Sequence, residues 1–214
     1  MSRRIFWALA ATLILIQPGA SQERATYRLD IEVTWSEATH PFEFFPNAHL
    51  TRFMGASHNR RYTLFGDGRT ASSGLRSVAE RGRIDILRVE MQDADERGRL
   101  GETFEGEGFG VPGIASVTVS VTEEHGLVSF ATMIAPSPDW FTGVASVLLF
   151  DGQWADRVEV TLWPWDAGTD SGTTWTAENA ETQPRESIRL STAPYFLGLG
   201  SLKPLGIATF VRIE

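Results

Sequence analysis

The sequence predicts an all-β fold, an antiparallel β-sandwich that is C2-like, with one or two short helices in its connections. Residues 27–35 (YRLDIEVTW) alternate apolar and polar side chains without exception, as in a strand with one buried face. Similar short runs recur along the chain. In addition, 20 glycines and 10 prolines are spread without any period, which is typical of many strands joined by turns.

The other expected strands follow the first along the chain. They are at residues 60–66, 84–91, 114–122, 127–134, 144–150, 157–163 and 206–213. Turn-forming sequences such as Asp151-Gly152 separate them, because aspartate and glycine favour the backbone conformations of tight turns. Strand patterns alone leave a closed barrel as an alternative to the sandwich.

One stretch between these strands has helical spacing. Residues 71–79 carry apolar side chains at intervals that place them on one face of a helix, and Gly82 suits its C-terminal cap. Residues 93–100 (DADERGRL) predict either a further helical turn or an acidic loop. Neither a flexible linker nor an internal repeat divides the chain, so we expect one domain over residues 26–214.

Residues 1–22 have the pattern of a secretory signal peptide. Arg3 and Arg4 precede an unbroken apolar run (IFWALAATLILI), and a Gln-Pro-Gly sequence ends that run ahead of small residues. A helix of that length rises only about 18 Å, whereas the hydrocarbon core of a bilayer is roughly 30 Å thick. We therefore expect cleavage, no stable membrane span afterwards, and a secreted or periplasmic protein.

Charge and composition exclude several classes of protein. The formal net charge is -8, and no cluster of lysine and arginine supplies the basic face that a nucleic-acid partner needs. The absence of cysteine excludes disulfides, thiolate nucleophiles and cysteine-based zinc sites. The GxSxG, HExxH and glycine-rich phosphate-binding motifs are also missing from the sequence. We expect a protein that is not an enzyme and does not bind nucleic acid.

Three aspartates stand on loops at the ends of expected strands. Asp139 lies in the stiff PSPDW sequence at 136–140, and Asp166 and Asp170 bracket a turn in which Gly168 can take a positive φ. If the two loops meet, the carboxylates repel one another unless a cation or protons are present. Calcium suits three carboxylates and accepts irregular geometry. The alternative is that Asp139 and Asp166 cap turns while Asp170 is solvated.

Aromatic residues flank the same loops and leave two interpretations open. Trp140, Trp163 and Trp165 either pack against the core and loops or form a stacking platform for a sugar or peptide. A platform combined with calcium would make a calcium-dependent carbohydrate-binding module.

Two enzymatic alternatives use the same residues. Asp139 and His40 are candidates for a periplasmic hydrolase, and Asp139 with Asp166 is the carboxylate pair that a glycosidase would need. The simpler interpretation is that the histidines are hydrogen-bonded loop residues; they are His40, His49, His58 and His125.

Several segments together resemble the spondin domain family, the N-terminal module of F-spondin and mindin, which also occurs alone in bacterial secreted proteins. The most specific are PSPDWF at 136–141 and DAGTDSG at 166–172. Weaker support comes from segments that stand in the family's order; they are 35–36 (WS), 39–41 (THP), 55–58 (GASH) and 71–82. The chain resembles a free-standing bacterial member.

The resemblance implies a β-sandwich with calcium held at one end, and the family's metal-ligating aspartates carry over to Asp139, Asp166 and Asp170. It also implies matrix adhesion and no catalytic activity. We therefore expect a secreted, non-catalytic calcium-binding module that recognises a surface protein or glycan of unknown identity. The lack of cysteine departs from the animal members, which carry disulfides.

Overall fold

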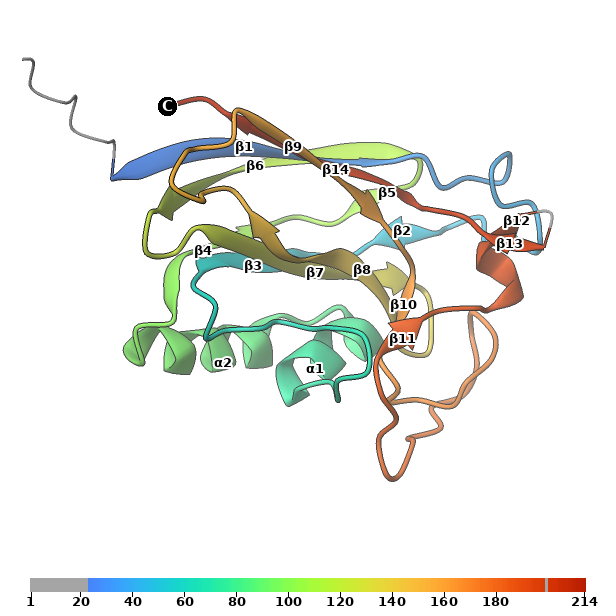
Figure 1. Cartoon of the computed structure of the whole chain (residues 1–214). Helices are drawn as coiled ribbons and strands as arrows, with labels where there is room; N and C mark the ends of the chain where they lie inside the picture. The colour runs from blue at the N-terminus through green and yellow to red at the C-terminus, as the bar shows by residue number, and fades with distance from the viewer. Residues whose placement is uncertain (1–22, 199) are drawn as a thin grey trace, which may run out of the picture.

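The computed structural model describes residues 23–198 and 200–214, and the predicted signal peptide at 1–22 lies outside the described residues. Figure 1 shows two β-sheets packed face to face, with two helices on the far side of the second sheet. The first sheet is antiparallel throughout, in the order β6-β1-β14-β9. Its strands are β6 (Gly113–Thr122), β1 (Arg24–Val33), β14 (Gly206–Arg212) and β9 (Arg157–Leu162).

The second sheet has the order β11-β10-β8-β7-β2-β5, with β3 paired to both β7 and β4. Its strands are β11 (Arg189–Leu190), β10 (Trp165–Asp166), β8 (Trp140–Leu148), β7 (Leu127–Ala135), β2 (His49–Leu50), β5 (Phe109–Gly110), β3 (Phe53–His58) and β4 (Leu100–Gly106). A short hairpin, β12 (Leu197–Gly198) and β13 (Ser201–Leu202), follows the 3-10 turn Pro194–Phe196. The architecture confirms the expected antiparallel sandwich.

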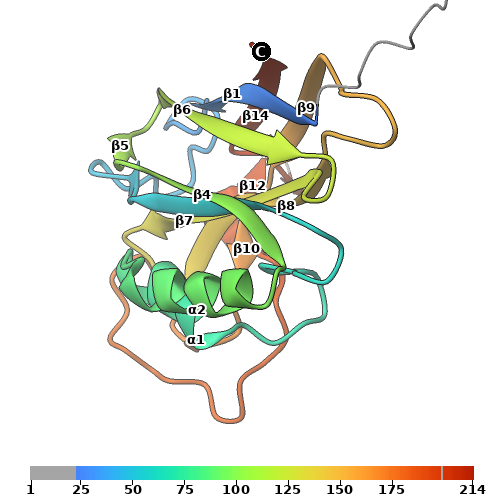
Figure 2. The same ribbon diagram turned by 90° about the vertical axis from the view of Figure 1, so that its left-hand side faces the viewer.

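Two helices cover the outer face of the second sheet, as Figure 2 shows. Helix α1 (Ser73–Arg81) begins at Ser72, whose hydroxyl accepts a hydrogen bond from the Leu75 amide, and it ends at Gly82 in the left-handed conformation. Helix α2 (Asp85–Glu96) follows directly. No helix among the described residues is long and apolar enough to cross a membrane.

The second sheet separates two hydrophobic clusters. The cluster between the sheets contains the inward-facing residues of β1, among them Tyr27 and Ile31, packed against Phe130 of β7. The cluster between the second sheet and the helices contains Leu75 and Phe141. Both faces of the second sheet are therefore buried, whereas the first sheet exposes its outer face.

Several expected elements differ from those observed. Residues 60–66 form turns rather than a strand, and residues 84–91 lie in α2 rather than in a strand. In the 84–91 segment the buried residues Leu87 and Met91 are four apart, which is helical spacing. The strand expected at 144–150 is β8, displaced to 140–148.

Two of the longer strands, β3 and β4, have no counterpart in the sequence prediction. Every residue of β3 is buried, so its sequence lacks the alternation that marks a half-buried strand. Most of β4 faces solvent or is only partly buried, and it carries few apolar residues to show a pattern.

Candidate functional site

The two acidic loops meet at one end of the second sheet. Strand β10 pairs with the start of β8, so that Asp166 lies opposite Trp140. One residue further along, the Ala167 amide donates a hydrogen bond of 3.2 Å to the Asp139 carbonyl. The ladder between these strands therefore brings Asp139 against the 166–170 turn, which meets the condition that the two acidic loops lie together.

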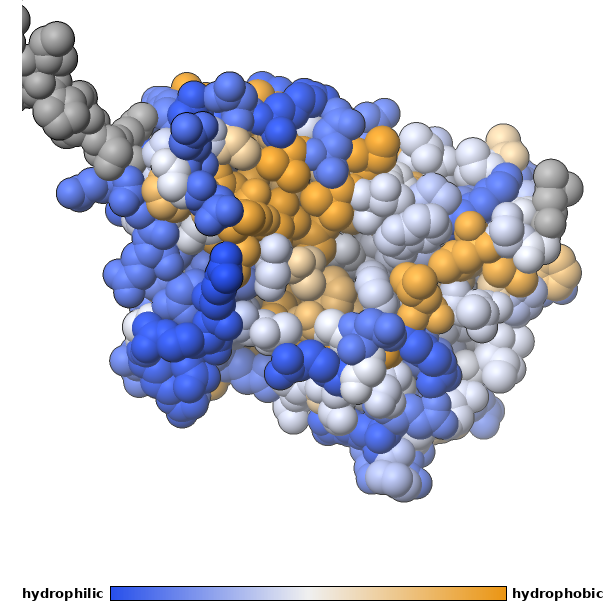
Figure 3. Space-filling view, in the orientation of Figure 1, coloured by the Kyte–Doolittle hydropathy of each residue, from blue (hydrophilic) through white to orange (hydrophobic). Residues whose placement is uncertain are grey.

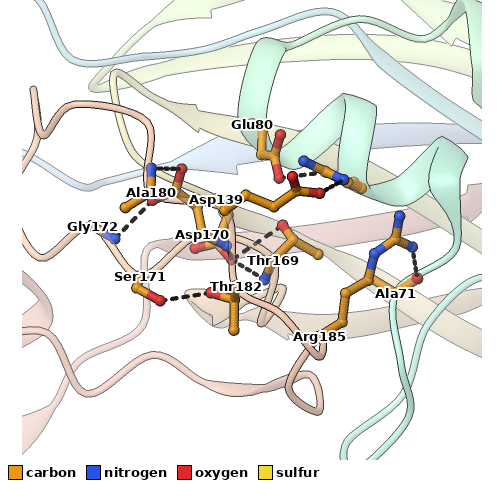
Figure 4. A network of polar contacts seen from close by, with 12 residues as sticks. Ala71, Glu80, Asp139, Thr169, Asp170, Ser171, Gly172, Ala180, Thr182 and Arg185 are labelled. Atoms are coloured by element: carbon orange, nitrogen blue, oxygen red, sulfur yellow. Dashed lines mark hydrogen bonds and ion pairs between the residues drawn. The ribbon is translucent and has the colours of Figure 1, made fainter.

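Asp139 is fully buried at this junction. Its Oδ2 accepts hydrogen bonds from the Thr169 amide at 2.7 Å and from the Asp170 amide at 3.1 Å, and the Thr169 hydroxyl lies at 3.3 Å (Figure 4). Its Oδ1 has no hydrogen-bond partner among the described residues. One oxygen of the carboxylate is thus held by the turn, and the other is buried and unsatisfied, which is costly for a charged group.

The electrostatic surroundings of Asp139 disfavour its charged form. Burial is the largest cause and the negative charge of Asp166 adds to it; together they raise the pKa of Asp139 to about 6, against the opposing effect of the Thr169 and Asp170 amides. The carboxylate oxygens of neighbouring acids are therefore close enough to repel. A bound cation would relieve both the desolvation and the repulsion.

Asp166 is tied to its own turn. Its Oδ1 accepts a hydrogen bond of 2.9 Å from the Gly168 amide, and its Oδ2 lies 3.2 Å from the Arg189 guanidinium. Burial raises the pKa of Asp166, while the Gly168 amide and Arg189 work in the opposite direction. Gly168 has φ 69°, so this prediction of a left-handed glycine is confirmed.

Asp170 organises the segment that follows it. Its Oδ1 accepts a hydrogen bond of 2.7 Å from the Gly172 amide, and its Oδ2 accepts one of 3.0 Å from the Ala180 amide. The Ser171 amide also donates to the Ala180 carbonyl, at 2.8 Å, and the Ser171 and Thr182 hydroxyls lie 2.7 Å apart (Figure 4), so the chain folds back on itself. Residues 171–187, which we call the 171–187 segment, thus start and return at the acidic site.

The donor set suits a hard cation, but its oxygens are engaged with the protein. Asp166 and Asp170 use their carboxylates to accept backbone amides, and each oxygen keeps a second lone pair with which it can ligate calcium. Over the described ranges, 23–198 and 200–214, no group of three or more His, Asp or Glu side chains converges as a metal site. Calcium binding by Asp139, Asp166 and Asp170 therefore stays a prediction. The fully buried Asp139 Oδ1, which has no partner among the described residues, favours it.

The tryptophans divide between core and surface. Trp140 is 3% exposed and packs edge-on against Trp175 and Phe196 at ring distances of 5.2 Å, so it does not belong to a surface platform. Trp163 and Trp165 are partly exposed and line a hollow of about 290 Å³ between β8 and β9. Figure 3 shows apolar surface gathered in this region of the molecule.

The contacts of the histidines are those of structural residues, although His40 Nε2 and His125 Nε2 are buried without a hydrogen-bond partner among the described residues. His40 is 2% exposed, its Nδ1 lies 2.9 Å from the Thr39 hydroxyl, and burial lowers its pKa. None of the hydrogen bonds among the described residues joins His40 to Asp139, as a hydrolytic pair would require. His58 lies in β3 rather than in a loop, fully buried, which corrects the sequence-based expectation.

Other residues at this end were not singled out by the sequence. Arg189 pairs with Asp166, and Trp175 fixes the 171–187 segment by inserting its ring into the aromatic cluster and donating from Nε1 to the Glu43 carbonyl at 2.9 Å. Arg76 of α1 reaches the same segment through Glu181. These contacts join residues far apart in the chain, so no local sequence pattern predicts them.

Comparisons with known proteins agree on one family. A family model described as Spondin_N matches residues 25–196. Spondin-2 from Rattus norvegicus and from Homo sapiens is 34% identical over 209 residues, which covers 89% of this chain and 62% of the relative. Spondin-1 from Gallus gallus is 37% identical over 177 residues, covering 79% of this chain and 22% of the relative. The chain thus spans less than two thirds of the length of these relatives.

Proposed function

The chain belongs to the spondin N-terminal domain family, and on this premise we propose that it is a non-catalytic recognition module whose loop end binds calcium. Its location is secreted or periplasmic, as in the family, and an adhesion-type role is part of the proposal. The calcium site and the recognition of a particular surface or matrix component are the proposed part.

One observation carries the metal proposal, namely that the fully buried Asp139 Oδ1 has no hydrogen-bond partner in the part of the chain that the structure describes. Asp139 makes hydrogen bonds next to both of the other acids. Its Oδ2 accepts the Asp170 amide, and its carbonyl accepts the amide of Ala167, the residue after Asp166. Asp139, Asp166 and Asp170 would hold the ion through their carboxylate oxygens. Calcium there would neutralise charges that now oppose one another.

The 171–187 segment links the site to recognition. Asp170 holds the start and the middle of this segment through the Gly172 and Ala180 amides. A metal that fixes Asp170 against Asp139 would keep this segment in one arrangement before a partner arrives. Pre-ordered loops bind with a smaller entropic cost than loops that order on contact.

The test measures calcium binding and its effect on stability. Thermal unfolding and isothermal titration calorimetry are run on the mature protein with calcium, with magnesium and with chelator. We expect calcium to raise the melting temperature, because a ligand that binds only the folded state stabilises it. Asp139→Asn should abolish the rise and keep the fold in chelator, since an amide oxygen can still accept the Thr169 and Asp170 amides.

Asp151→Asn is the matched control, because Asp151 is exposed in the turn after β8 and the charge change is the same. This variant should keep the full calcium response. A wild-type protein whose melting temperature ignores calcium, or an Asp139→Asn variant that responds as the wild type does, would contradict the proposal.

A second candidate function is carbohydrate binding, which the hollow between β8 and β9 favours. Trp163 and Trp165 line it together with Phe65, and partly exposed aromatic rings are suitable for stacking on sugars. Glycan-array binding that Trp163→Ala removes, while the calcium response persists, would support this function. Absence of any glycan signal for the calcium-loaded protein would count against it.

A further inference from the structure

A groove lined by arginine runs along the outer side of α1. It has a volume of about 320 Å³ and lies between α1 and the returning end of the 171–187 segment. Its lining residues are Ser73, Arg76, Ser77, Glu80, Arg81, Ile86, Glu181 and Arg185. We call it the arginine groove. None of the three predicted metal ligands lines it.

Arg76 crosses the arginine groove and already binds two carboxylates. Its Nε donates to Glu80 at 2.7 Å and its Nη1 donates to Glu181 at 2.5 Å, from opposite walls. The Glu80 side chain is only 4% exposed, whereas that of Glu181 is 42% exposed. Glu80 is therefore a fixed internal partner, and Glu181 is a solvent-accessible carboxylate presented by an extended stretch of chain.

Two further arginines in the groove lack a carboxylate. Arg81 is exposed, and Arg185 donates from Nη1 to the Ala71 carbonyl at 3.1 Å (Figure 4). In the part of the chain that the structure describes, neither makes a salt bridge within 4.0 Å. Guanidinium groups match carboxylates with paired hydrogen bonds. The groove thus has three guanidinium groups and two carboxylates, which is a local excess of positive charge in a chain whose net charge is -8.

We propose that the arginine groove binds a glutamate or aspartate side chain of an acidic peptide segment in a partner protein. The proposed role as a recognition module is the premise on which this inference rests. Arg81 and Arg185 would receive the incoming carboxylate, much as Arg76 receives Glu181. Ile86, 43% exposed at the edge, offers an apolar contact to a residue beside that carboxylate, which favours a peptide over a hydrated polyanionic glycan.

The groove and the acidic site share one structural element. Glu181 lies opposite Asp170 in an isolated antiparallel bridge, and the neighbouring Ala180 amide donates to Asp170. The wall that carries Glu181 and Arg185 is thus held in place by Asp170. A calcium ion at the acidic site would act on the wall of the groove through that residue.

Fluorescence anisotropy with two synthetic peptides tests the inference. One is a short fluorescein-labelled peptide of alternating glutamate and leucine, and the other has glutamine in place of glutamate. We expect the acidic peptide to bind about tenfold more tightly than its twin, a difference of about 1.4 kcal/mol. The advantage should shrink as salt is added, since exposed charges are screened.

Variants assign the binding to the groove. The double variant Arg81→Gln with Arg185→Gln should remove most of the preference for the acidic peptide. The matched control is Arg24→Gln with Arg60→Gln, which makes the same charge change at exposed arginines outside the groove. Equal binding of the two peptides, or a double variant that binds as the wild type does, overturns the inference. Stronger competition by a heparin oligosaccharide than by unlabelled acidic peptide also overturns it, in favour of a glycan.

Calcium and chelator arms separate this inference from the proposed metal site. If calcium raises the melting temperature and the peptides bind equally, the groove proposal alone fails. If the acidic peptide binds through Arg81 and Arg185 and calcium changes nothing, the groove proposal is supported and the metal proposal fails.

Discussion

Two buried polar side chains, His58 and Asp139, differ in how completely their atoms are satisfied. His58 Nδ1 lies 2.9 Å from the Asn59 carbonyl, which only accepts, so this nitrogen carries the proton. Its Nε2 then accepts from the Ser129 hydroxyl at 2.7 Å. Both ring nitrogens of His58 have partners, whereas one oxygen of Asp139 has none. Among the described residues the buried Nε atoms of Trp35, His40 and His125 also lack a partner. Asp139 differs from them because the atom without a partner belongs to a carboxylate, whose charged form is a ligand for a hard cation.

The buried, neutral state of His58 predicts a loss of stability in acid. Burial lowers the pKa of His58 below 6.5, and the neighbouring His125 lowers it further, while the Tyr62 ring packs at 5.2 Å. Below pH 6.5 the unfolded chain takes up a proton that the folded protein resists. The free energy of unfolding should therefore fall as the pH decreases through this range.

Urea denaturation at a series of pH values measures this dependence. His58→Gln should be less stable at neutral pH by about 1–3 kcal/mol, because the Ser129 hydroxyl loses its acceptor and keeps only the Ser146 amide as a partner. It should also lose less stability in acid than the wild type. His49→Gln, at an exposed position, should follow the wild-type curve. A wild-type curve parallel to that of His58→Gln would show that His58 does not titrate on unfolding.

Loop position and the family resemblance singled out the three aspartates, but not what their oxygens contact. Asp139, Asp166 and Asp170 were predicted from loop position, and the structure brings their loops together. The amide donors that hold them lie within the same turns or arrive from residue 180, and the direction of a backbone amide cannot be read from sequence. His58 was expected in a loop for another reason, because its strand β3 is buried throughout and shows no alternation of apolar and polar residues.

At the scale of elements, the 166–170 turn depends on a glycine whose surroundings are crowded. Gly168 has φ 69°, and a Cβ there would lie 2.6 Å from the Glu186 carbonyl oxygen. Gly152, in the turn after β8, has φ 75° with nothing within 4 Å of the same position. The two glycines therefore share a backbone conformation and differ in packing.

Alanine substitution at the two glycines separates conformational strain from collision. Gly152→Ala should cost about 1 kcal/mol, the penalty of a left-handed non-glycine residue. Gly168→Ala should cost more, because the Glu186 backbone must move and the Asp166 turn with it. Chemical denaturation of both variants measures the difference. Equal losses of stability would mean that the turn relaxes without resistance from residue 186.

The accuracy of the element predictions followed from how each element is buried. Strand β1 and helix α1 bury one face, so alternation in one and helical spacing in the other located them correctly. Strand β3 is buried on both faces and had no pattern to detect. Helix α2 was taken for a strand because the short apolar run at 84–91 fits both periods when it is read in isolation.

At the scale of the whole molecule, the second sheet is shared by both hydrophobic clusters. Phe130 of β7 faces the first sheet, and its neighbour Ala131 faces the helices. Each cluster packs against one face of this sheet, so the loss of either cluster would leave one face of the shared sheet unpacked. The molecule should therefore unfold as one cooperative unit.

Leu75→Ala tests this cooperativity. Leu75 is fully buried under α1, and its truncation should cost about 2–4 kcal/mol. Tryptophan fluorescence, dominated by the cluster between the sheets, and circular dichroism of the helices should still change at one denaturant concentration. Val89→Ala, at an exposed position on α2, should change little. Two separated transitions would mean that the helical layer unfolds independently.

The sandwich and its sheet pairing direction were predictable from composition and alternation, but its closure at the acidic end was not. The 171–187 segment is fixed by Asp170, by the contact of Arg76 with Glu181 and by Trp175. The Asp170 contact with Gly172 is local, whereas the contacts of Arg76 and Trp175 join residues more than a hundred positions apart and depend on folding of the whole chain. The arginine groove arises in the same way, from α1 and a segment about a hundred residues later.

The position of Trp175 has a practical consequence. The centre of its ring lies 5.2 Å from that of Trp140 and 5.7 Å from that of Trp35. Trp175 itself belongs to the 171–187 segment, which is neither strand nor helix. Indoles this close couple electronically, so their joint optical signal depends on whether residue 175 is docked. Unlabelled protein thus carries an intrinsic spectroscopic probe that can report, in real time, when this part of the chain detaches.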